Sequence, residues 1–391
     1  MTEQSSTPEL RFPEFKEKLT LQKLNSVASV TMGQSPKSNN YTDDSKQITL
    51  VQGNTDLKNG EINSRIYTTE ITKIAKVQDI ILTVRAPVGE LAIAQKEVCI
   101  GRGVCAIKAN KFIYYFLEKF KIDKLWARLS QGSTFEAISG NDIKNISVTL
   151  PSKKEQTKIG DFFSKLDQQI ELEEKKLELL EQQKRGYIQK VFSQELRFKD
   201  ENGNSYPKWS IKKIEDISKV NKGFTPNTKN NEYWDELNEN WLSIAGMTQK
   251  YLYKGNKGIT EKGASKHAKV DKDTLIMSFK LTLGKLAIVK EPIYTNEAIC
   301  HFVWKESNVS TEYMYYYLNS INISTFGAQA VKGVTLNNDS INSIIVKLPV
   351  IEEQNKIAYF FNKLDKLIRK QYDKIEVLKQ RKKGLLQKMF I

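Results

Sequence analysis

The sequence has few of the residues from which most enzyme active sites are built. It contains two histidines and three cysteines in 391 residues, with no Cys-x-x-Cys pair, which argues against a zinc cluster and against a disulfide framework. It has no Pro-Pro and no G-x-x-x-x-G-K-[ST] phosphate loop, and the Gly-Arg-Gly of Gly101–Gly103 lacks the continuation of a dinucleotide-binding motif. We therefore expect no catalytic residues, no metal and no cofactor in this chain.

Long apolar runs are also missing. No 18-residue apolar stretch occurs, and the first residues have neither the basic start nor the apolar core of a signal peptide. The three cysteines are too sparse for a secreted disulfide scaffold. These absences together predict a cytoplasmic protein that does not associate with a membrane.

Positive charge is what the sequence has in excess. It carries 61 Lys and Arg against 46 Asp and Glu, for a net charge of +15. The excess is spread along the chain, since residues 1–150 hold 20 basic and 16 acidic residues and residues 193–348 hold 21 and 17. This distribution is compatible with a polyanionic partner such as nucleic acid, and equally with a charge that only keeps the protein soluble.

The chain also repeats itself. Leu150–Phe192 aligns without gaps with Leu348–Phe390 at a constant offset of 198, and both copies read L-P-x-x-x-E-Q-x-x-I-x-x-F-F-x-K-L-D. Weaker echoes precede each copy: E-L-R-F at Glu9–Phe12 and Glu195–Phe198, G-x-[ST]-P at Gly33–Pro36 and Gly223–Pro226, and G-x-L-A-I at Gly89–Ile93 and Gly284–Ile288. The repeat predicts four parts, namely globular segments 1–150 and 193–348 and helical segments 151–192 and 349–391.

Each helical segment should form one long helix with an apolar stripe. Apolar residues recur at intervals of three and four, and the two stripes are listed here: Ile159, Phe162, Leu166, Ile170, Leu177, Leu180, Tyr187 and Val191 in the first copy, and Ile357, Phe360, Leu364, Leu367, Ile375, Leu378, Leu385 and Met389 in the second. We expect the two helices to bury these stripes against each other as an antiparallel coiled coil, because a pseudo-two-fold axis lets each copy present the same face. Gly186 and Gly384 then mark either points of close approach by another helix or tolerated defects.

The globular segments mix strand and helix patterns. Short apolar runs rich in β-branched residues predict strands at Asp79–Val84, Leu91–Ala94, Thr274–Phe279 and Leu286–Val289. Phe112–Phe120 and Glu312–Ser320 have the pattern of short amphipathic helices. The predicted fold class is α/β (α+β): two mixed domains related by pseudo-two-fold symmetry and joined by the two long helices.

The paired helix starts, the L-R-F segments and the G-x-[ST]-P loops together resemble one family, the specificity (S) subunits of type I restriction–modification systems. The resemblance covers essentially the whole chain. It implies that the two globular segments are target-recognition domains, which read the 5′ and 3′ halves of a bipartite, asymmetric site in double-stranded DNA, and that the coiled coil fixes the spacer between the halves. It also implies two methylation subunits with S-adenosylmethionine and restriction/translocase subunits with ATP and Mg²⁺, so that no chemistry resides in this chain.

Candidate DNA-binding residues lie in glycine-bearing loops and at strand ends in repeat-equivalent places. Arginine can form two hydrogen bonds to guanine O6 and N7, and other polar groups can hold phosphates. The same segments could instead be ordinary turns or surface ion pairs. The candidates are Gly33, Gln34, Ser35, Lys37, Arg85, Gln131, Ser133 and Thr134 in the first repeat and Lys222, Gly223, Thr225, Lys280, Lys332 and Thr335 in the second.

The helix starts are the candidate surface for partner subunits. Consecutive residues on a helix lie about 100° apart, so one ring of each Phe-Phe pair can enter the coil while the other serves a partner. Alternatively, both rings pack onto their own globular segment. The partner-binding candidates are Glu155, Gln156, Phe162, Phe163, Glu353, Gln354, Phe360 and Phe361.

Two other interpretations of the whole chain stay open. The chain could be a fragment of a single-chain restriction–methylation enzyme, although no cofactor motif supports that. It could also be a coiled-coil scaffold that binds no DNA, in which case its basic charge would be incidental.

Overall fold

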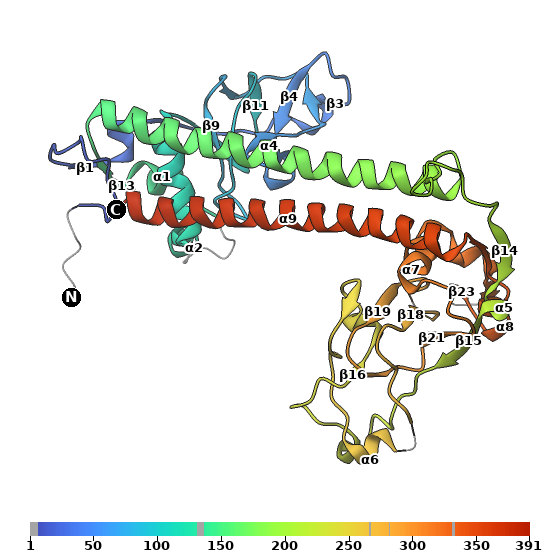
Figure 1. The fold of residues 1–391 in the computed structure, drawn as a ribbon. Helices are drawn as coiled ribbons and strands as arrows, with labels where there is room; N and C mark the ends of the chain where they lie inside the picture. The colour runs from blue at the N-terminus through green and yellow to red at the C-terminus, as the bar shows by residue number, and fades with distance from the viewer. Residues whose placement is uncertain (1–6, 131–136, 266, 281, 331–332) are drawn as a thin grey trace. The chain divides into compact units, whose positions relative to one another are not determined.

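The computed structural model describes residues 7–130, 137–265, 267–280, 282–330 and 333–391. The chain divides into two compact units (Figure 1). The first unit consists of Met1–Lys175 together with Gln371–Ile391, and the second consists of Lys176–Lys370. Each unit therefore combines one globular segment with part of both long helices.

The first unit is built on two small sheets. One has the strand order β2 (Ser29–Met32), β12 (Val104–Lys108), β9 (Ile80–Thr83), β10 (Leu91–Ile93), β6 (Glu61–Ile62), β5 (Leu57–Lys58). The other has the order β3 (Tyr41–Thr42), β7 (Tyr67–Thr68), β4 (Ile48–Val51), β11 (Val98–Ile100), β8 (Ile74–Ala75). Strand β1 (Thr20–Lys23) pairs antiparallel with β13 (Ser147–Leu150), and the helices are α1 (Lys111–Ile122), α2 (Leu125–Ser130) and α3 (Gly140–Lys144).

The second unit repeats this plan. Its main sheet has the order β15 (Ser218–Lys222), β21 (Ile299–Trp304), β18 (Leu275–Ser278), β19 (Leu286–Val289), β17 (Tyr251–Leu252). Smaller pairs are β14 (Ser210–Lys213) with β24 (Ile345–Leu348), β16 (Trp241–Leu242) with β20 (Tyr294–Thr295), and β22 (Ala328–Ala330) with β23 (Gly333–Thr335). The helices are α5 (Ile214–Ile217), α6 (Glu261–Ala264), α7 (Thr311–Ser320) and α8 (Asn338–Asn342). The predicted mixed α/β class is confirmed.

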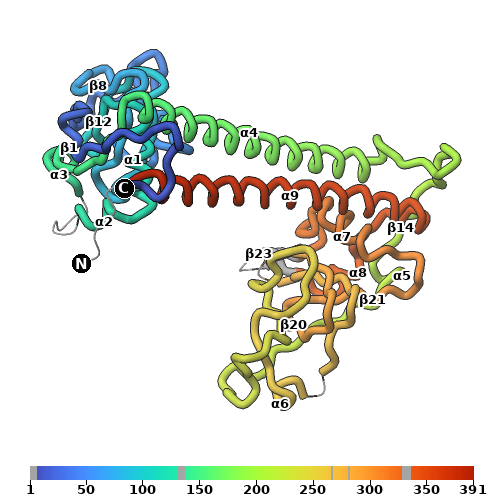
Figure 2. Tube along the Cα trace, turned by 60° about the vertical axis from the view of Figure 1, so that its left-hand side comes forward, coloured from blue at the N-terminus to red at the C-terminus, as the bar shows by residue number. Residues whose placement is uncertain are grey.

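The two long helices are α4 (Lys153–Phe192) and α9 (Ile351–Met389). Within the first unit, Lys382 Nζ lies 2.7 Å from Asp167 Oδ1, and within the second, Lys184 Nζ lies 2.5 Å from Asp365 Oδ1. These two ion pairs are repeat-equivalent, because 184 and 382, like 167 and 365, differ by the offset of 198. The predicted antiparallel pairing of the helices is thus present in each unit, where their traces run side by side (Figures 1 and 2).

The C-terminal end of each long helix packs into the hydrophobic core of the other repeat's globular segment. In the first unit the ring of Phe390 lies 4.9 Å from that of Phe112 on α1. In the second unit the ring of the equivalent Phe192 lies 6.0 Å from Phe361 and stacks on it. Both rings are at least nine-tenths buried, so each contributes about 2–3 kcal/mol of apolar burial to the unit it enters.

The surroundings of the two helix glycines decide between the two alternatives stated above. A Cβ placed on Gly186 or Gly384 would meet nothing within 4 Å, so neither marks a close approach and both are tolerated defects. The close approach occurs instead at Gly160, where a Cβ would lie 2.8 Å from Lys111 Cβ on α1. Leu367 was also predicted to face the partner helix, but its side chain is 52% exposed.

No helix in the described ranges is long and apolar enough to span a membrane.

Candidate nucleic-acid interface

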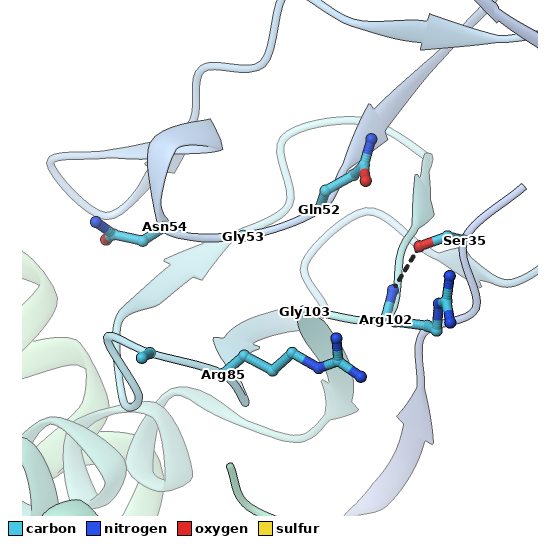
Figure 3. Close-up of a pocket in the computed structure, with 8 residues that line it drawn as sticks. Ser35, Gln52, Gly53, Asn54, Arg85, Arg102 and Gly103 are labelled. Atoms are coloured by element: carbon cyan, nitrogen blue, oxygen red, sulfur yellow. Dashed lines mark hydrogen bonds between the residues drawn. The ribbon is translucent and has the colours of Figure 1, made fainter. Parts of the chain in front are cut away.

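A hollow of about 330 Å³ opens on the surface of the first unit. Two arginine side chains enter it, both exposed, and no carboxylate is among its lining residues (Figure 3). Neither guanidinium forms an ion pair with another residue in the parts of the chain that the structure describes. The lining residues are Ser35, Gln52, Gly53, Asn54, Arg85, Ala86, Arg102 and Gly103.

The ends of β9 and β12 bring the two arginines to one hollow. The antiparallel register of these strands ends at Thr83 and Val104, and a 2.9 Å hydrogen bond from Val84 N–H to the Gly103 carbonyl follows it. Arg85 comes directly after Val84 and forms a β-bridge with Ala137, whereas Arg102 lies in the turn before β12, which is closed by the Val104 N–H donating to the Gly101 carbonyl at 3.1 Å. Figure 3 shows both guanidinium groups at the same side of the hollow. The sequence prediction included Arg85 but missed Arg102, because only the fold brings Arg102 to the hollow that Arg85 lines.

Two glycines and a serine fix the backbone at Arg102. A Cβ on Gly103 would lie 1.9 Å from the Gln52 carbonyl oxygen, and a Cβ on Gly101 would lie 3.1 Å from both Gln52 Cγ and Ser35 Oγ. The Arg102 N–H donates to Ser35 Oγ at 3.1 Å. Only glycine fits at position 103, and a side chain at position 101 would have to displace Gln52 or Ser35, so the arginine is the one side chain that this segment projects.

The glycines of the G-x-[ST]-P loops are required by their own unit. A Cβ on Gly33 would lie 2.1 Å from the Gly101 carbonyl oxygen, and a Cβ on Gly223 would lie 2.1 Å from the Thr295 carbonyl oxygen. The close contact made possible by these glycines is therefore internal, with a neighbouring strand or loop. Gln34 keeps an exposed side chain, while its N–H donates to the Ile100 carbonyl at 2.9 Å.

The remaining loop candidates have different surroundings. Lys37 has an exposed side chain, and its backbone N–H donates to the Glu70 carboxylate at 2.8 Å, which lowers the pKa of Glu70. Thr225 Oγ1 accepts a 2.8 Å hydrogen bond from Asn296 Nδ2. Ser35 and Thr225 are repeat-equivalent, and each ties its loop to the segment that precedes β12 or β21.

In the second unit, Lys222 and Lys280 approach the same aromatic ring. Their Nζ atoms lie 4.6 Å and 5.7 Å from the centroid of Phe279, a ring that is 1% exposed. Both lysines are exposed, and a ring face offers a cation about 0.5–1 kcal/mol at such sites. The structure thus brings together two cations that the sequence analysis proposed separately.

For five of the DNA-binding candidates the structure gives little or no information. Gln131, Ser133, Thr134 and Lys332 lie outside the described residues. Thr335 is the last residue of β23. Their assignment to DNA binding stays a prediction.

The predicted partner-binding glutamates are buried in ion pairs within their own units. Glu155 accepts hydrogen bonds from Arg11 Nε at 2.8 Å and Nη2 at 2.7 Å, and this bonding raises the pKa of Arg11. Glu353 accepts from Arg197 Nε at 3.2 Å and Nη2 at 2.7 Å, and also from Trp209 Nε1 at 2.9 Å. The arginine of each L-R-F segment therefore holds the glutamate at the start of a long helix.

The phenylalanines at the helix starts follow the second of the two alternatives stated above. Phe163 and Phe361 are fully buried. Phe162 and Phe360 are half-buried and meet the L-R-F rings Phe12 and Phe198 edge-on, at 5.9 Å and 5.6 Å. Both rings of each pair thus pack onto their own unit.

The two glutamines serve as local hydrogen-bonding groups. Gln156 donates to the Pro151 carbonyl at 2.9 Å, and Gln354 donates to the Pro349 carbonyl at 2.8 Å. Gln354 is fully buried, whereas Gln156 keeps some exposed surface. Of the eight partner-binding candidates, only Gln156, Phe162 and Phe360 retain surface that a partner could touch, and that contact stays a prediction.

Partly buried titratable groups cluster where α9 contacts α1 and α4 in the first unit. Lys382 Nζ lies 2.6 Å from Glu118 Oε2 and 2.7 Å from Asp167 Oδ1. Burial raises the pKa of Glu118. Burial also works to lower the pKa of Lys382, but the two carboxylates outweigh it and raise that pKa. This cluster joins α9 to α1 and to α4.

Groups that could carry other chemistry are few. Cys99, Cys105 and Cys300 are buried free thiols, and burial raises the pKa of Cys105 and Cys300 to about 12. Within the described residues, no three His, Cys, Asp or Glu side chains come together in a way that could hold a metal ion. The cationic surfaces around Arg85 and Phe279 are thus the features best suited to bind a ligand.

Comparison with known proteins shows which family this chain resembles. The family model described as the type I restriction modification DNA specificity domain matches residues 16–182 and again residues 206–380. The putative type I restriction enzyme MjaX specificity subunit of Methanocaldococcus jannaschii is 34% identical over 178 residues, which cover 44% of this chain and 41% of that protein. The MjaIX specificity subunit of the same organism is 31% identical over 209 residues, or 51% of this chain and 48% of that protein. The matched region thus spans less than half the length of these two relatives.

Two solved structures share the fold. The S subunit of a type I restriction–modification system from M. genitalium superimposes with a TM-score of 0.61 at 17% identity, covering 98% of this chain and 99% of that one. A chain from a structure concerned with complex assembly and conformational transition of the type I R-M system gives a TM-score of 0.64 at 15% identity, covering 96% and 98%. Because the family model matches most of the chain in two consecutive copies, the chain belongs to the type I restriction–modification specificity subunit family.

Proposed function

We propose that this chain is the non-catalytic, DNA-reading subunit of a type I restriction–modification complex, in which each unit reads one half of a bipartite, asymmetric site. The observation that carries the proposal is a repeated one. Each unit exposes a pair of cations near the ends of its strands: Arg85 and Arg102 line one hollow, and Lys222 and Lys280 both lie near the ring of Phe279. Cations neutralise phosphates and, as arginine, also read base edges.

The long helices support a role in spacing the two half-sites. A helix rises 1.5 Å per residue and is far stiffer than a flexible linker. Helices α4 and α9 are continuous over 40 and 39 residues. The repeat-equivalent ion pairs Lys184–Asp365 and Lys382–Asp167 hold the two helices to each other in both units. In this proposal the helix pair sets the spacer length.

The same helices offer surface for protein partners. Leu172, Leu179 and Val377 are 66%, 57% and 67% exposed on α4 and α9. Exposed apolar side chains on a long helix are suited to protein contacts. We propose that two methylation subunits dock along this pair, bringing S-adenosylmethionine, and that restriction/translocase subunits bring ATP and Mg²⁺.

The test is to express the chain with its cognate methylation subunit in a host that lacks DNA methylation, and to map modified adenines by single-molecule sequencing. A single asymmetric motif of two short blocks with a fixed gap, absent without this chain, is the expected result. A stable complex that methylates no defined motif would contradict the proposal and favour a scaffold protein. Methylation by the purified chain alone would instead indicate a hidden enzyme.

Salt dependence provides an independent check on binding. A DNA reader that makes 6–10 phosphate contacts loses about 10³- to 10⁵-fold in affinity between 50 and 200 mM salt. The complex with the methylation subunit should follow this steep dependence on a duplex that contains the motif. An affinity that is independent of salt would argue against DNA as the ligand of the basic surfaces.

A further inference from the structure

Arg85 and Arg102 bring two like charges to one hollow, and neither has an ion-pair partner among the described residues. Like charges that share a site repel each other unless a group of opposite charge neutralises them. No carboxylate lines the hollow, although Asp56 lies close by. That carboxylate is 8% exposed and accepts hydrogen bonds from the backbone N–H groups of Gln52 at 2.7 Å and Gly53 at 3.2 Å. The arginines are thus left for a ligand rich in hydrogen-bond acceptors.

The second unit carries a different pair at the same place. Its β18–β21 register pairs Ser278 with Ile299, and Phe279 N–H donates to the Ala298 carbonyl at 3.0 Å. Lys280 and Glu297 are the next residues beyond this hydrogen-bonded pair, as Arg85 and Arg102 are the next residues beyond Val84 and Gly103. These repeat-equivalent positions therefore hold Arg and Arg in one repeat and Lys and Glu in the other, a change of two charge units from +2 to 0.

The difference in charge between the two repeats favours base reading over phosphate binding at these positions. The phosphate backbone is the same in every DNA sequence, so a position that only holds phosphate has no reason to reverse its charge between two DNA-binding repeats. A base edge changes with sequence. Arginine matches the O6 and N7 acceptors of guanine, whereas a glutamate accepts from the N4 amino group of cytosine.

We infer that Arg85 and Arg102 are the specificity-determining pair of the first unit, that they bind guanine in the major groove, and that Lys280 and Glu297 occupy the corresponding place for a different base pair in the second unit. This inference rests on the proposed function, because it assumes that both units bind DNA. It adds Arg102 and Glu297 to the site and names the base that the first unit requires.

The fixed backbone around Arg102 supports a reading role. Discrimination between bases needs a side chain whose origin does not move, because a guanidinium can form its two hydrogen bonds only at one position and angle. Gly101 and Gly103 press the segment against Gln52, and Ser35 Oγ accepts from the Arg102 N–H. The Gln52 and Asn54 side chains line the same hollow and supply amides, which suit adenine N6 and N7.

The experiment compares methylation motifs of the complete complex for the wild type, Arg102→Ala and Arg102→Gln. Arg65→Ala is the matched control, because it removes the charge of another exposed arginine of the first unit that does not line the hollow. In the Arg102 variants we expect one guanine position in one half-site to accept other bases, with preference reduced about 5- to 150-fold, the equivalent of 1–3 kcal/mol. The control should keep the wild-type motif, and Glu297→Ala should relax only the other half-site.

A modified duplex tests the contact itself. Replacing that guanine by 7-deazaguanine removes the N7 acceptor and should weaken binding by the wild-type complex. The same replacement should have little further effect on Arg102→Ala, because two changes to one contact are not additive. Thermal unfolding of each variant checks that it folds.

Several results would overturn the inference while leaving the proposed function intact. One is a wild-type bipartite motif without guanine in the half-site that the first unit reads. A second is an Arg102→Ala motif identical to that of the wild type. A third is a uniform loss of methylation with an unchanged motif, which would make Arg102 a phosphate contact. If the wild-type complex produced no motif at all, the proposed function would fail and the inference with it.

Discussion

At the scale of single residues, the two repeats bind a repeat-equivalent buried glutamate with different sets of side chains. A buried carboxylate at the start of each long helix is held by the arginine of an L-R-F segment. Around Glu353 the indole N–H of Trp209 adds a third hydrogen bond. In the first repeat the position equivalent to Trp209 holds Leu19, which has no side-chain donor for Glu155. A partner removed from a buried ion pair leaves the other charge uncompensated, which costs more than the pair itself contributes.

The first prediction follows from that difference. Glu155→Ala and Glu353→Ala should each lower the free energy of unfolding by about 2 kcal/mol, because a partly exposed arginine loses the carboxylate that accepts its hydrogen bonds. Glu353→Ala should cost about 1 kcal/mol more, because the Trp209 N–H is also left without an acceptor. Urea denaturation of each variant gives both values. The exposed neighbour Glu352→Ala is the control and should stay within about 0.5 kcal/mol of the wild type.

A second residue-scale prediction concerns pH. His301 is buried beside Thr295, and burial lowers its pKa to about 4. An unfolded histidine has a pKa near 6.5, so between these values the unfolded chain binds a proton that the folded chain does not. The stability that this group contributes is therefore complete above about pH 6.5 and is lost as the pH falls toward 4, by at most about 3 kcal/mol.

The measurement is the free energy of unfolding at several pH values between 7 and 4.5, followed by tryptophan fluorescence. Four of the five tryptophans, namely Trp209, Trp234, Trp241 and Trp304, lie in the second unit with His301. Carboxylates also titrate toward the acid end, so the variant His301→Gln is needed for comparison. If the wild type and the variant lost stability in parallel, His301 would not be the group responsible.

At the scale of elements, the helices were far easier to predict than the small strands. The apolar stripe and the Leu-Pro starts placed the helices at 151–192 and 349–391, and the structure has them at Lys153–Phe192 and Ile351–Met389. Strands of two residues, such as β5 (Leu57–Lys58) and β17 (Tyr251–Leu252), are too short to show an alternation of apolar and polar residues in the sequence. Their positions are determined by strands that are distant in sequence.

The candidate site was predictable only in part, for the same reason. Arg85 stood out because Lys280 occupies its equivalent position after a recognisable strand. Arg102 lies in a Gly-Arg-Gly segment whose meaning depends on Gln52, fifty residues earlier in the chain. The helix-start glutamates were proposed as partner contacts because the motif is repeated, but repetition does not distinguish a structural role from a functional one. Their pairing with Arg11 and Arg197 could not be foreseen from the sequence.

The third prediction compares helix glycines in opposite surroundings. Gly186→Ala and Gly384→Ala should each stabilise the protein by about 1 kcal/mol, because a Cβ meets nothing within 4 Å there and alanine favours the helix. Gly160→Ala should destabilise it, because its Cβ would meet Lys111 Cβ at 2.8 Å and α1 would have to shift. Thermal unfolding measures all three. Equal shifts of one sign would contradict this account of the glycines.

At the scale of the whole molecule, the core of each unit is completed by the C-terminal end of the long helix that starts in the other unit. The core of the first unit contains Phe390, Met389 and Leu386 from the end of α9, and that of the second contains Val191 and Phe192 from the end of α4. The two globular segments thus depend on the long helices for their own stability. A change in helix length is tolerated only if it leaves both of these ends in place.

The last prediction concerns the spacer and uses that constraint. Seven residues of helical sequence inserted after Lys175 in α4, together with seven inserted after Lys370 in α9, fall at the boundaries between the two units. They lengthen both helices by about 10 Å, close to two full turns, so that each helix keeps its facing side chains. With DNA rising 3.4 Å per base pair, the gap in the methylation motif should grow by about three base pairs while both half-sites stay the same.

Insertion into α4 alone is the matched control, because the two helices can then keep only one of their two ion pairs in register, Lys184 with Asp365 or Lys382 with Asp167. That variant should unfold at lower temperature and methylate poorly. Single-molecule sequencing of DNA from hosts carrying each variant reads out the gap directly. A paired insertion that folds and methylates with an unchanged gap would mean that the helix pair does not measure the spacer, and that the distance between the half-sites is set by the partner subunits.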